Sequence, residues 1–296
     1  MSKDHHHSHT DVENIKVAFF LNFGFTILEF IGGMYVNSVA ILSDAIHDLG
    51  DSISLGMSWY FQKLSHRGRT HNYSYGYRRF SVLSAILNSS ILLIGSVFIL
   101  KETIPRLFSP QQPETKGMIL LAILGVLVNG LAVLKTKKGR TANEKVVSLH
   151  LMEDVLGWIA VLIGSVIMNF WHIPILDPIL SLLIAGYILF NVFKNLKGSI
   201  NIMLQSIPSE VDLQKLESLL LTIPQVKQVH DMHTWSMDGE YHVMTVHLVL
   251  GEELDFERRV EIKERARQIL KEGAMKHVTI ELEGHDEHCD LVDNHS

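Results

Sequence analysis

The sequence predicts an integral membrane protein in which an all-α bundle of six transmembrane helices precedes a small cytoplasmic α+β domain. Of its 296 residues, 47% are hydrophobic and only 20% are charged, which is too apolar for a disordered chain and unusual for a soluble enzyme. Nearly all long uncharged runs fall before about residue 195, and the last third of the chain has the composition of a soluble domain.

Six apolar runs are long enough to cross a bilayer, whose core of about 30 Å requires roughly 20 residues of helix. The connections between these runs are short, so neighbouring helices should pack antiparallel to one another. The connections after the second and fourth runs are rich in Lys and Arg, which predicts that both termini lie on the cytoplasmic side. The six predicted spans are Ile15–Val36, Val39–Phe61, Phe80–Ile104, Gly117–Leu134, Val146–Trp171 and Leu176–Phe193.

After Pro208 the chain changes to short alternating elements, with a hairpin turn at Asp238 and Gly239. A domain of roughly 80 residues buries a small core, so dimerisation is expected. The expected elements are a helix at 211–222, strands at 226–235 and 241–250, a helix at 256–271 and a strand at 278–283. The predicted organisation is a His-rich cytoplasmic tail (1–14), a transmembrane domain (15–200), a cytoplasmic domain (205–284) and a C-terminal tail (285–296).

The composition also limits the classes of partner and cofactor that the protein is expected to bind. The net charge of −6 gives no reason to expect binding to nucleic acid. The single cysteine, Cys289, excludes an intrachain disulfide and a zinc site made of four cysteines. No organic cofactor is expected. The 17 histidines are the unusual feature of the composition, and they direct attention to metal ions.

Two of the predicted spans carry the same pair of ionisable residues. His47 and Asp51 in the second span are four residues apart, as are His150 and Asp154 in the fifth, so each pair lies on one helix face. Ionisable residues at membrane depth are costly and usually line a substrate pathway. Two imidazoles and two carboxylates suit tetrahedral Zn²⁺, whereas the alternative is a structural hydrogen bond between helices.

Other polar residues also lie in the predicted spans. Asp44, Asp48 and Glu153 share the faces of the two motifs, and their roles stay open between an outer-sphere contact, a lining of the pathway and a structural partner. Asp177 is interpreted as a cap for its own helix at the start of the sixth span. The polar residues interpreted as packing contacts are Glu29, Asn22, Asn88 and Asn129.

Three sequence runs resemble the cation diffusion facilitators, a family of zinc and divalent-cation transporters that commonly act as metal/proton antiporters. These runs are Ser43-Asp44-Ala45-Ile46-His47, Tyr75-Gly76-Tyr77-Arg78-Arg79 and His230-Asp231-Met232-His233-Thr234-Trp235. The resemblance covers almost the whole chain and implies a homodimer in the lipid membrane with a ferredoxin-like, metallochaperone-like cytoplasmic domain. It also implies that the transport site consists of His47, Asp51, His150 and Asp154, in the combination typical of zinc-preferring members.

The resemblance further implies a regulatory metal site in the cytoplasmic domain. His230 and His247 fall on the two strands of the expected hairpin, where they can lie close together, although ordinary surface histidines are the alternative. Glu283 matches a third ligand position of the family. The expected soft cluster in the C-terminal tail comprises His285, His288 and Cys289. The N-terminal tail is expected to capture zinc near the cytoplasmic mouth of the transport pathway. The histidines of this tail are His5, His6, His7 and His9.

The sequence therefore predicts an efflux transporter that exchanges Zn²⁺ for protons and is not an enzyme. The short basic connection after the fourth span resembles bacterial members and predicts a bacterial cytoplasmic membrane. The alternatives are a transporter preferring Cd²⁺, Co²⁺ or Ni²⁺, and a membrane metal sensor that transports nothing. An intramembrane metalloprotease fits poorly because the sequence has no His-Glu-x-x-His and four protein ligands leave no position for a catalytic water.

Overall fold

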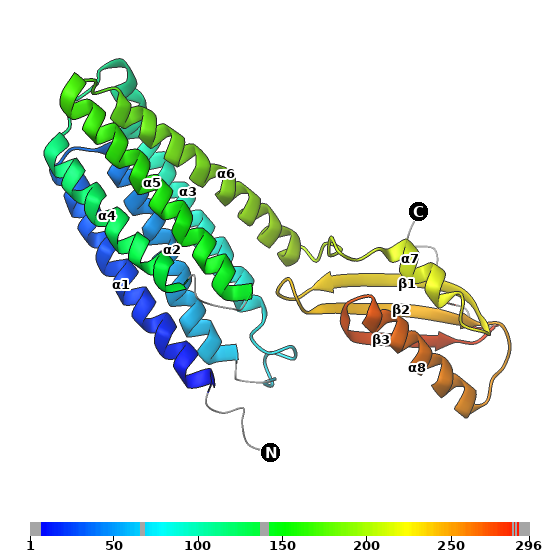
Figure 1. The fold of residues 1–296 in the computed structure, drawn as a ribbon. Helices are drawn as coiled ribbons and strands as arrows, with labels where there is room; N and C mark the ends of the chain where they lie inside the picture. The colour runs from blue at the N-terminus through cyan, green and yellow to red at the C-terminus, as the bar shows by residue number, and fades with distance from the viewer. Residues whose placement is uncertain (1–6, 66–68, 137–141, 286, 288, 290–296) are drawn as a thin grey trace. The chain divides into compact units, whose positions relative to one another are not determined.

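The computed structural model describes residues 7–65, 69–136, 142–285, 287 and 289. The chain divides into two compact units, one formed by residues 1–66 with 84–196 and the other by residues 67–83 with 197–296. Long helices come first along the chain, and a mixed α+β domain follows them (Figure 1). This order confirms the predicted fold class.

Six long helices follow one another in the described part of the chain, and each coincides with one predicted span. Most of them continue beyond the apolar run, because polar residues with adequate helix propensity extend the helix outside it. The first helix already begins at His7, so part of the expected tail is helical. The helices are α1 (His7–Tyr35), α2 (Val39–Ser65), α3 (Arg79–Phe108), α4 (Thr115–Thr136), α5 (Ala142–Trp171) and α6 (Leu176–Met203).

The surface of these helices suits a lipid environment. Among the described residues, three helical segments are long and apolar enough to cross a membrane, and Thr115–Leu131 is a shorter apolar helix. Large apolar side chains point outward, and Phe190 on α6 is 70% exposed. Exposed apolar area on this scale is unfavourable in water and is stable against lipid tails. The three long segments are Arg79–Phe108, Met152–Trp171 and Leu176–Met203.

Trp158 of α5 lies at the centre of the helical unit and is 1% exposed. It packs against Phe25 of α1, with 6.0 Å between the ring centroids, and against Gly125 of α4. The indole leaves no room for a side chain at Gly125. The glycine therefore permits the close approach of α4 and α5.

Asp177, at the start of α6, is buried and holds the beginning of α2. Its carboxylate accepts hydrogen bonds from the hydroxyl of Ser38 at 2.5 Å and from the backbone amide of Val39 at 2.9 Å. The first amides of a helix have no partner within the helix and carry a partial positive charge, so a carboxylate there is stabilising. Asp177 lies in the first turn of α6, where its charge suits the dipole of its own helix, but the amides that its carboxylate caps are those of α2.

Replacing Asp177 by alanine should destabilise the bundle. The substitution leaves the buried Val39 amide and Ser38 hydroxyl without their acceptor, which costs about 1–3 kcal/mol for each buried group. We expect a clear fall in the Tm of the detergent-solubilised protein. Asp177→Asn retains one acceptor oxygen and should have a smaller effect; equal effects of the two variants would contradict this role.

The second unit contains a three-stranded sheet in the order β1-β2-β3 (Figure 1). Strand β1 (Val226–Ser236) pairs antiparallel with β2 (His242–Leu250), and β2 pairs parallel with β3 (Met275–Glu283). Helices α7 (Leu213–Leu220) and α8 (Phe256–Glu272) contribute apolar side chains to one core with the sheet. All five elements lie where the sequence predicts them, to within a few residues.

Local sequence signals explain the element boundaries in this domain. The carboxylates of Asp212 and Asp255 accept hydrogen bonds from the amides of Lys215 and Arg258, so each aspartate caps the helix that follows it. The hairpin turns at Gly239, whose φ of +97° favours glycine. These signals are local, and they account for the agreement between the predicted and observed elements.

A β-bulge interrupts β1 in the histidine-rich run. His230 pairs with His247 and His233 pairs with Thr245, so three steps along β1 correspond to two steps along β2. Asp231 within the bulge has a φ of +48°. On a regular strand, residues three apart point to opposite faces. The extra residue brings His230 and His233 to the same face of the sheet.

Candidate metal centres

His47 on α2 lies between two aspartates of different helices. Its Nε2 atom is 3.6 Å from Asp51 Oδ2, one turn further along α2, and 3.8 Å from Asp154 Oδ1 on α5. One potential ligand atom from each of the three residues lies within 4.8 Å of the other two. The three side chains are 11–24% exposed. The structure thus brings together three of the four predicted ligands, from two helices.

His150 is the fourth predicted ligand of this site. It belongs to α5, four residues before Asp154, so the helix places it one turn away. Its side chain lies outside the part of the chain that the structure describes. Its participation in the site therefore stays a prediction.

Three further carboxyls are buried together in the helical unit. Glu29 on α1 and Asp44 and Asp48 on α2 are at most 6% exposed and lie close enough for their charges to interact. Among the described residues, no amide or hydroxyl donates to either oxygen of Glu29. Neighbouring carboxylates in a poorly hydrated site are costly, so protons or a cation must offset part of their charge. The interpretation of Glu29 as a simple packing contact overlooked this group.

Glu153 is not one of the residues that the structure brings together around His47. Its side chain is exposed and accepts a hydrogen bond of 2.8 Å from the hydroxyl of Tyr187 on α6. Two asparagines make the expected contacts between helices: Asn22 donates to Ser52, and Asn88 donates to Ser54. Asn129 is also buried, at 6% exposure.

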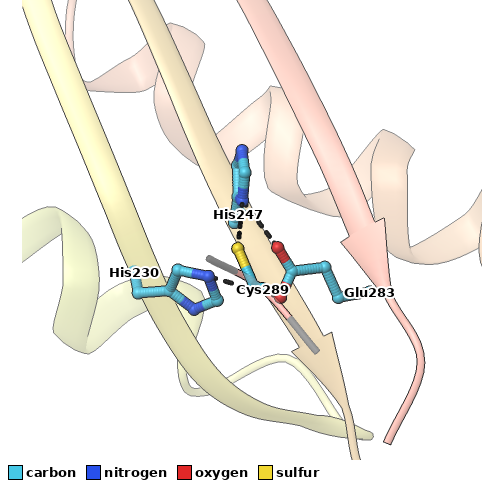
Figure 2. A group of neighbouring side chains, drawn as sticks. All are labelled: His230, His247, Glu283 and Cys289. Carbon is cyan, nitrogen blue, oxygen red and sulfur yellow. Dashed lines mark hydrogen bonds and ion pairs between the residues drawn. The ribbon is translucent and has the colours of Figure 1, made fainter. Parts of the chain in front are cut away.

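A second group of ligand side chains lies in the cytoplasmic domain, and Figure 2 shows the four side chains pointing toward one another. His247 Nδ1 lies 2.6 Å from Glu283 Oε1 and 3.7 Å from the Sγ atom of Cys289. His230 Nε2 lies 3.3 Å from the other oxygen of Glu283. The two histidines come from paired positions of β1 and β2, and Glu283 ends β3. Residues of all three strands, far apart in the sequence, therefore meet in one group.

The chemistry of this group fits a zinc ion. Two imidazole nitrogens, one carboxylate and one thiolate form a tetrahedral donor set that Zn²⁺ commonly takes. The side chain of His230 is 10% exposed, and neither of its buried ring nitrogens has a hydrogen bond within the described chain, although buried polar atoms normally do. A metal ion would use the free electron pair of His230 and neutralise the charge of Glu283, which is only 3% exposed.

Of the remaining predicted histidine ligands, the structure describes only the side chain of His285. His285 is exposed and lies outside the four-residue group, so the structure does not support it as a ligand there. His288 lies outside the described residues, as do His5 and His6. His7 and His9 open α1, but the description does not extend to their side chains.

His242 shows that a buried histidine of this domain need not face a metal. At the start of β2, its Nε2 atom lies 2.7 Å from Glu210 Oε1. The pKa of Glu210 lies below its ordinary value, chiefly through a hydrogen bond to its own backbone amide and further through Ser209 and His242. His242 is thus paired with one carboxylate, and it is not part of the group formed by His230, His247, Glu283 and Cys289.

The described residues thus include one group of potential metal ligands on two apolar helices and a second group in the domain that follows, an arrangement expected of a metal-ion transporter. Residues 15–204 match the cation efflux transmembrane domain, and residues 208–285 match the cytoplasmic domain of cation efflux proteins. The chain therefore belongs to the cation diffusion facilitator family. As a member it is a transporter and not an enzyme, which excludes the metalloprotease alternative, and its C-terminal domain is cytoplasmic.

Three bacterial relatives match the chain over nearly their full lengths. The cadmium, cobalt and zinc/H(+)-K(+) antiporter of Bacillus subtilis (strain 168) is 31% identical, over 94% of this chain and 91% of the relative. The metal cation efflux system protein CzcD of Cupriavidus metallidurans is 31% identical, over 96% and 90% of the two chains. The zinc transporter ZitB of Escherichia coli (strain K12) is 29% identical, over 94% and 92%.

Proposed function

We propose that this protein exports divalent cations, Zn²⁺ in particular, from the cytoplasm in exchange for protons. The transport site is formed by His47, Asp51, His150 and Asp154. The observation that chiefly supports it is the approach of His47 on α2 to Asp154 on α5, because a site shared by two helices can open and close as they move. The names of the relatives, which include zinc transport and antiport with protons, agree with this proposal.

The charge of the site gives a physical reason for exchange. With neutral imidazoles, the carboxylates of Asp51 and Asp154 give the empty site a charge of about −2, which one Zn²⁺ or two protons neutralise. The empty, unprotonated site is costly in a low dielectric, so the metal-loaded and proton-loaded forms change access most readily. Because metal binding displaces protons from its ligands, a proton gradient drives metal in the opposite direction.

In this proposal the cytoplasmic group of His230, His247, Glu283 and Cys289 binds a regulatory Zn²⁺. The small domain forms a homodimer, and bound metal favours one arrangement of its two copies. Metal can shift such an equilibrium only if the two arrangements bind it with different affinities. We place the protein in a bacterial cytoplasmic membrane with both termini on the cytoplasmic side, on the basis of its basic connections and its bacterial relatives.

Simultaneous recording of metal and proton movement tests this proposal. The purified protein is placed in liposomes that contain a zinc indicator and a pH indicator, with an acidic interior. Zinc added outside should enter and raise the internal pH at the same time, and Cd²⁺ or Co²⁺ should do so more slowly. Zinc entry that leaves the internal pH unchanged would contradict proton exchange, and faster Cd²⁺ entry would contradict the preference for zinc.

A further inference from the structure

We infer that Asp231 is a positioning residue of the cytoplasmic metal site, which holds the His247 imidazole in the form that binds the ion. This inference rests on the proposed zinc site and adds an outer residue that takes no direct part in ligation. It follows from the way the two nitrogens of His247 are used. Nδ1 faces the ligands Glu283 and Cys289, whereas Nε2 faces Asp231 Oδ2 at 3.5 Å and Glu281 Oε2 at 3.4 Å.

The tautomer of His247 decides whether it can bind metal. A neutral imidazole carries its proton on one nitrogen and offers an electron pair on the other. Ligation through Nδ1 therefore requires the proton on Nε2, and a carboxylate beside Nε2 stabilises this form. Metal-ligating histidines generally donate their second N–H to such a group, which fixes the ring and strengthens the ligand. Asp231 is placed to accept that hydrogen bond.

Two carboxylates face Nε2, and the structure favours Asp231 over Glu281. The side chain of Asp231 is 12% exposed, whereas that of Glu281 is 61% exposed. An exposed carboxylate is screened by water and loses side-chain entropy on pairing. Asp231 is further held by His233, whose Nε2 lies 2.8 Å from Asp231 Oδ1. One carboxylate thus joins two histidines of neighbouring strands.

The β-bulge in β1 allows the Asp231 carboxylate to lie beside His247. On a regular strand, Asp231 would point to the face opposite His230 and its partner His247. The bulge, with its positive φ at Asp231, turns the carboxylate toward His247 and brings His233 to the same face. Left-handed backbone is uncommon outside glycine, although aspartate tolerates it better than most residues, and it often marks functional positions.

The test uses Co²⁺ as a spectroscopic substitute for Zn²⁺ in the full-length protein in detergent. Cys289 is the only cysteine of the chain, so the thiolate-to-cobalt charge-transfer band reports on the cytoplasmic site alone, even while the membrane site also binds metal. Asp231→Asn should raise the Co²⁺ concentration that half-saturates this band by roughly 10- to 100-fold. The neutral amide can present its NH₂ group to Nε2 and thereby favour the wrong tautomer.

Two further variants separate positioning from folding. Glu281→Gln removes the exposed carboxylate at the same nitrogen and should leave the half-saturating Co²⁺ concentration within about twofold of the wild type. Asp231→Glu retains a carboxylate and should recover part of the affinity, a recovery that a purely structural defect would not produce. The Tm of the metal-free protein should be similar for Asp231→Asn and Glu281→Gln, whereas Asp231→Glu should lower it slightly, because glutamate tolerates the positive φ at this position less well than aspartate or asparagine.

The outcomes are distinguishable. A wild-type protein without the thiolate band overturns the cytoplasmic metal site and the inference with it. A wild-type band with unchanged half-saturation in Asp231→Asn overturns only the role of Asp231. A loss of affinity in Glu281→Gln as large as that in Asp231→Asn overturns the choice between the two carboxylates.

Discussion

Replacing Asp154 by alanine is expected to lower the rate of Zn²⁺ uptake into proteoliposomes by more than about 100-fold. Loss of an outer-sphere partner already costs roughly 10- to 100-fold at a metal site, and Asp154 is a proposed direct ligand. It is also the residue through which α5 approaches His47, at 3.8 Å. The rate is measured with an indicator inside the vesicles at equal amounts of reconstituted protein.

Glu153 provides the matched control. Glu153→Gln removes a carboxylate from the neighbouring position of α5, but this side chain is exposed and bonded to Tyr187. Its uptake rate should stay within about twofold of the wild type, the range usual for surface substitutions. Comparable losses of uptake in the Asp154 and Glu153 variants would contradict a specific role of the Asp154 carboxylate. They would show instead that uptake is sensitive to any substitution in this turn of α5.

Replacing Glu283 by glutamine should abolish metal binding at the cytoplasmic site while only reducing transport. Glu283 is buried and contacts both His230 and His247. The glutamine amide is neutral, so the substitution removes the only carboxylate among the four proposed ligands. The Co²⁺ concentration required for the thiolate band should rise more than about 100-fold. Zinc uptake should fall by less than about tenfold, since the membrane site is intact.

The matching control is Glu217→Gln on the exposed face of α7, which makes the same change of charge outside the metal group. It should alter neither the band nor the uptake. Complete loss of uptake in Glu283→Gln, with the protein still folded, would contradict a regulatory role and indicate that cytoplasmic metal is essential for transport.

The positions of the helices and strands could be predicted because their signals are local. The second helix begins at Val39, and β1 begins at Val226, both as expected. An apolar run of about 20 residues, an aspartate cap or an Asp-Gly turn acts within a few residues. The helix ends were less accurate: α6 continues to Met203, well past the end of the apolar run.

The candidate membrane site could be predicted in part. Helical periodicity places His47 and Asp51 on one face, and it does the same for His150 and Asp154. Helical periodicity alone does not predict that α2 and α5 face each other. That expectation came from the duplicated motif and from the family resemblance. Nor could the direction of neighbouring side chains be predicted, as Glu153 shows by turning to Tyr187 on α6.

Long-range and irregular features escaped the sequence argument. The contact of Asp177 with Val39 joins residues 138 positions apart. The bulge at Asp231 changes which residues share a face, and periodicity assumes a regular strand. The burial of Glu29 had one available signal, an isolated acidic residue within an apolar span, and such residues in membrane helices are usually functional.

Proton-coupled transport through the membrane site is tested by Zn²⁺ flux into proteoliposomes with and without a pH gradient, for the wild type and Asp154→Ala, with the cobalt–thiolate band recorded on the same preparations. We expect gradient-dependent flux in the wild type, loss of that flux in the variant, and an unchanged thiolate band in both. Metal binding without flux in the wild type, or gradient-dependent flux that survives in Asp154→Ala, would contradict proton-coupled transport through this site.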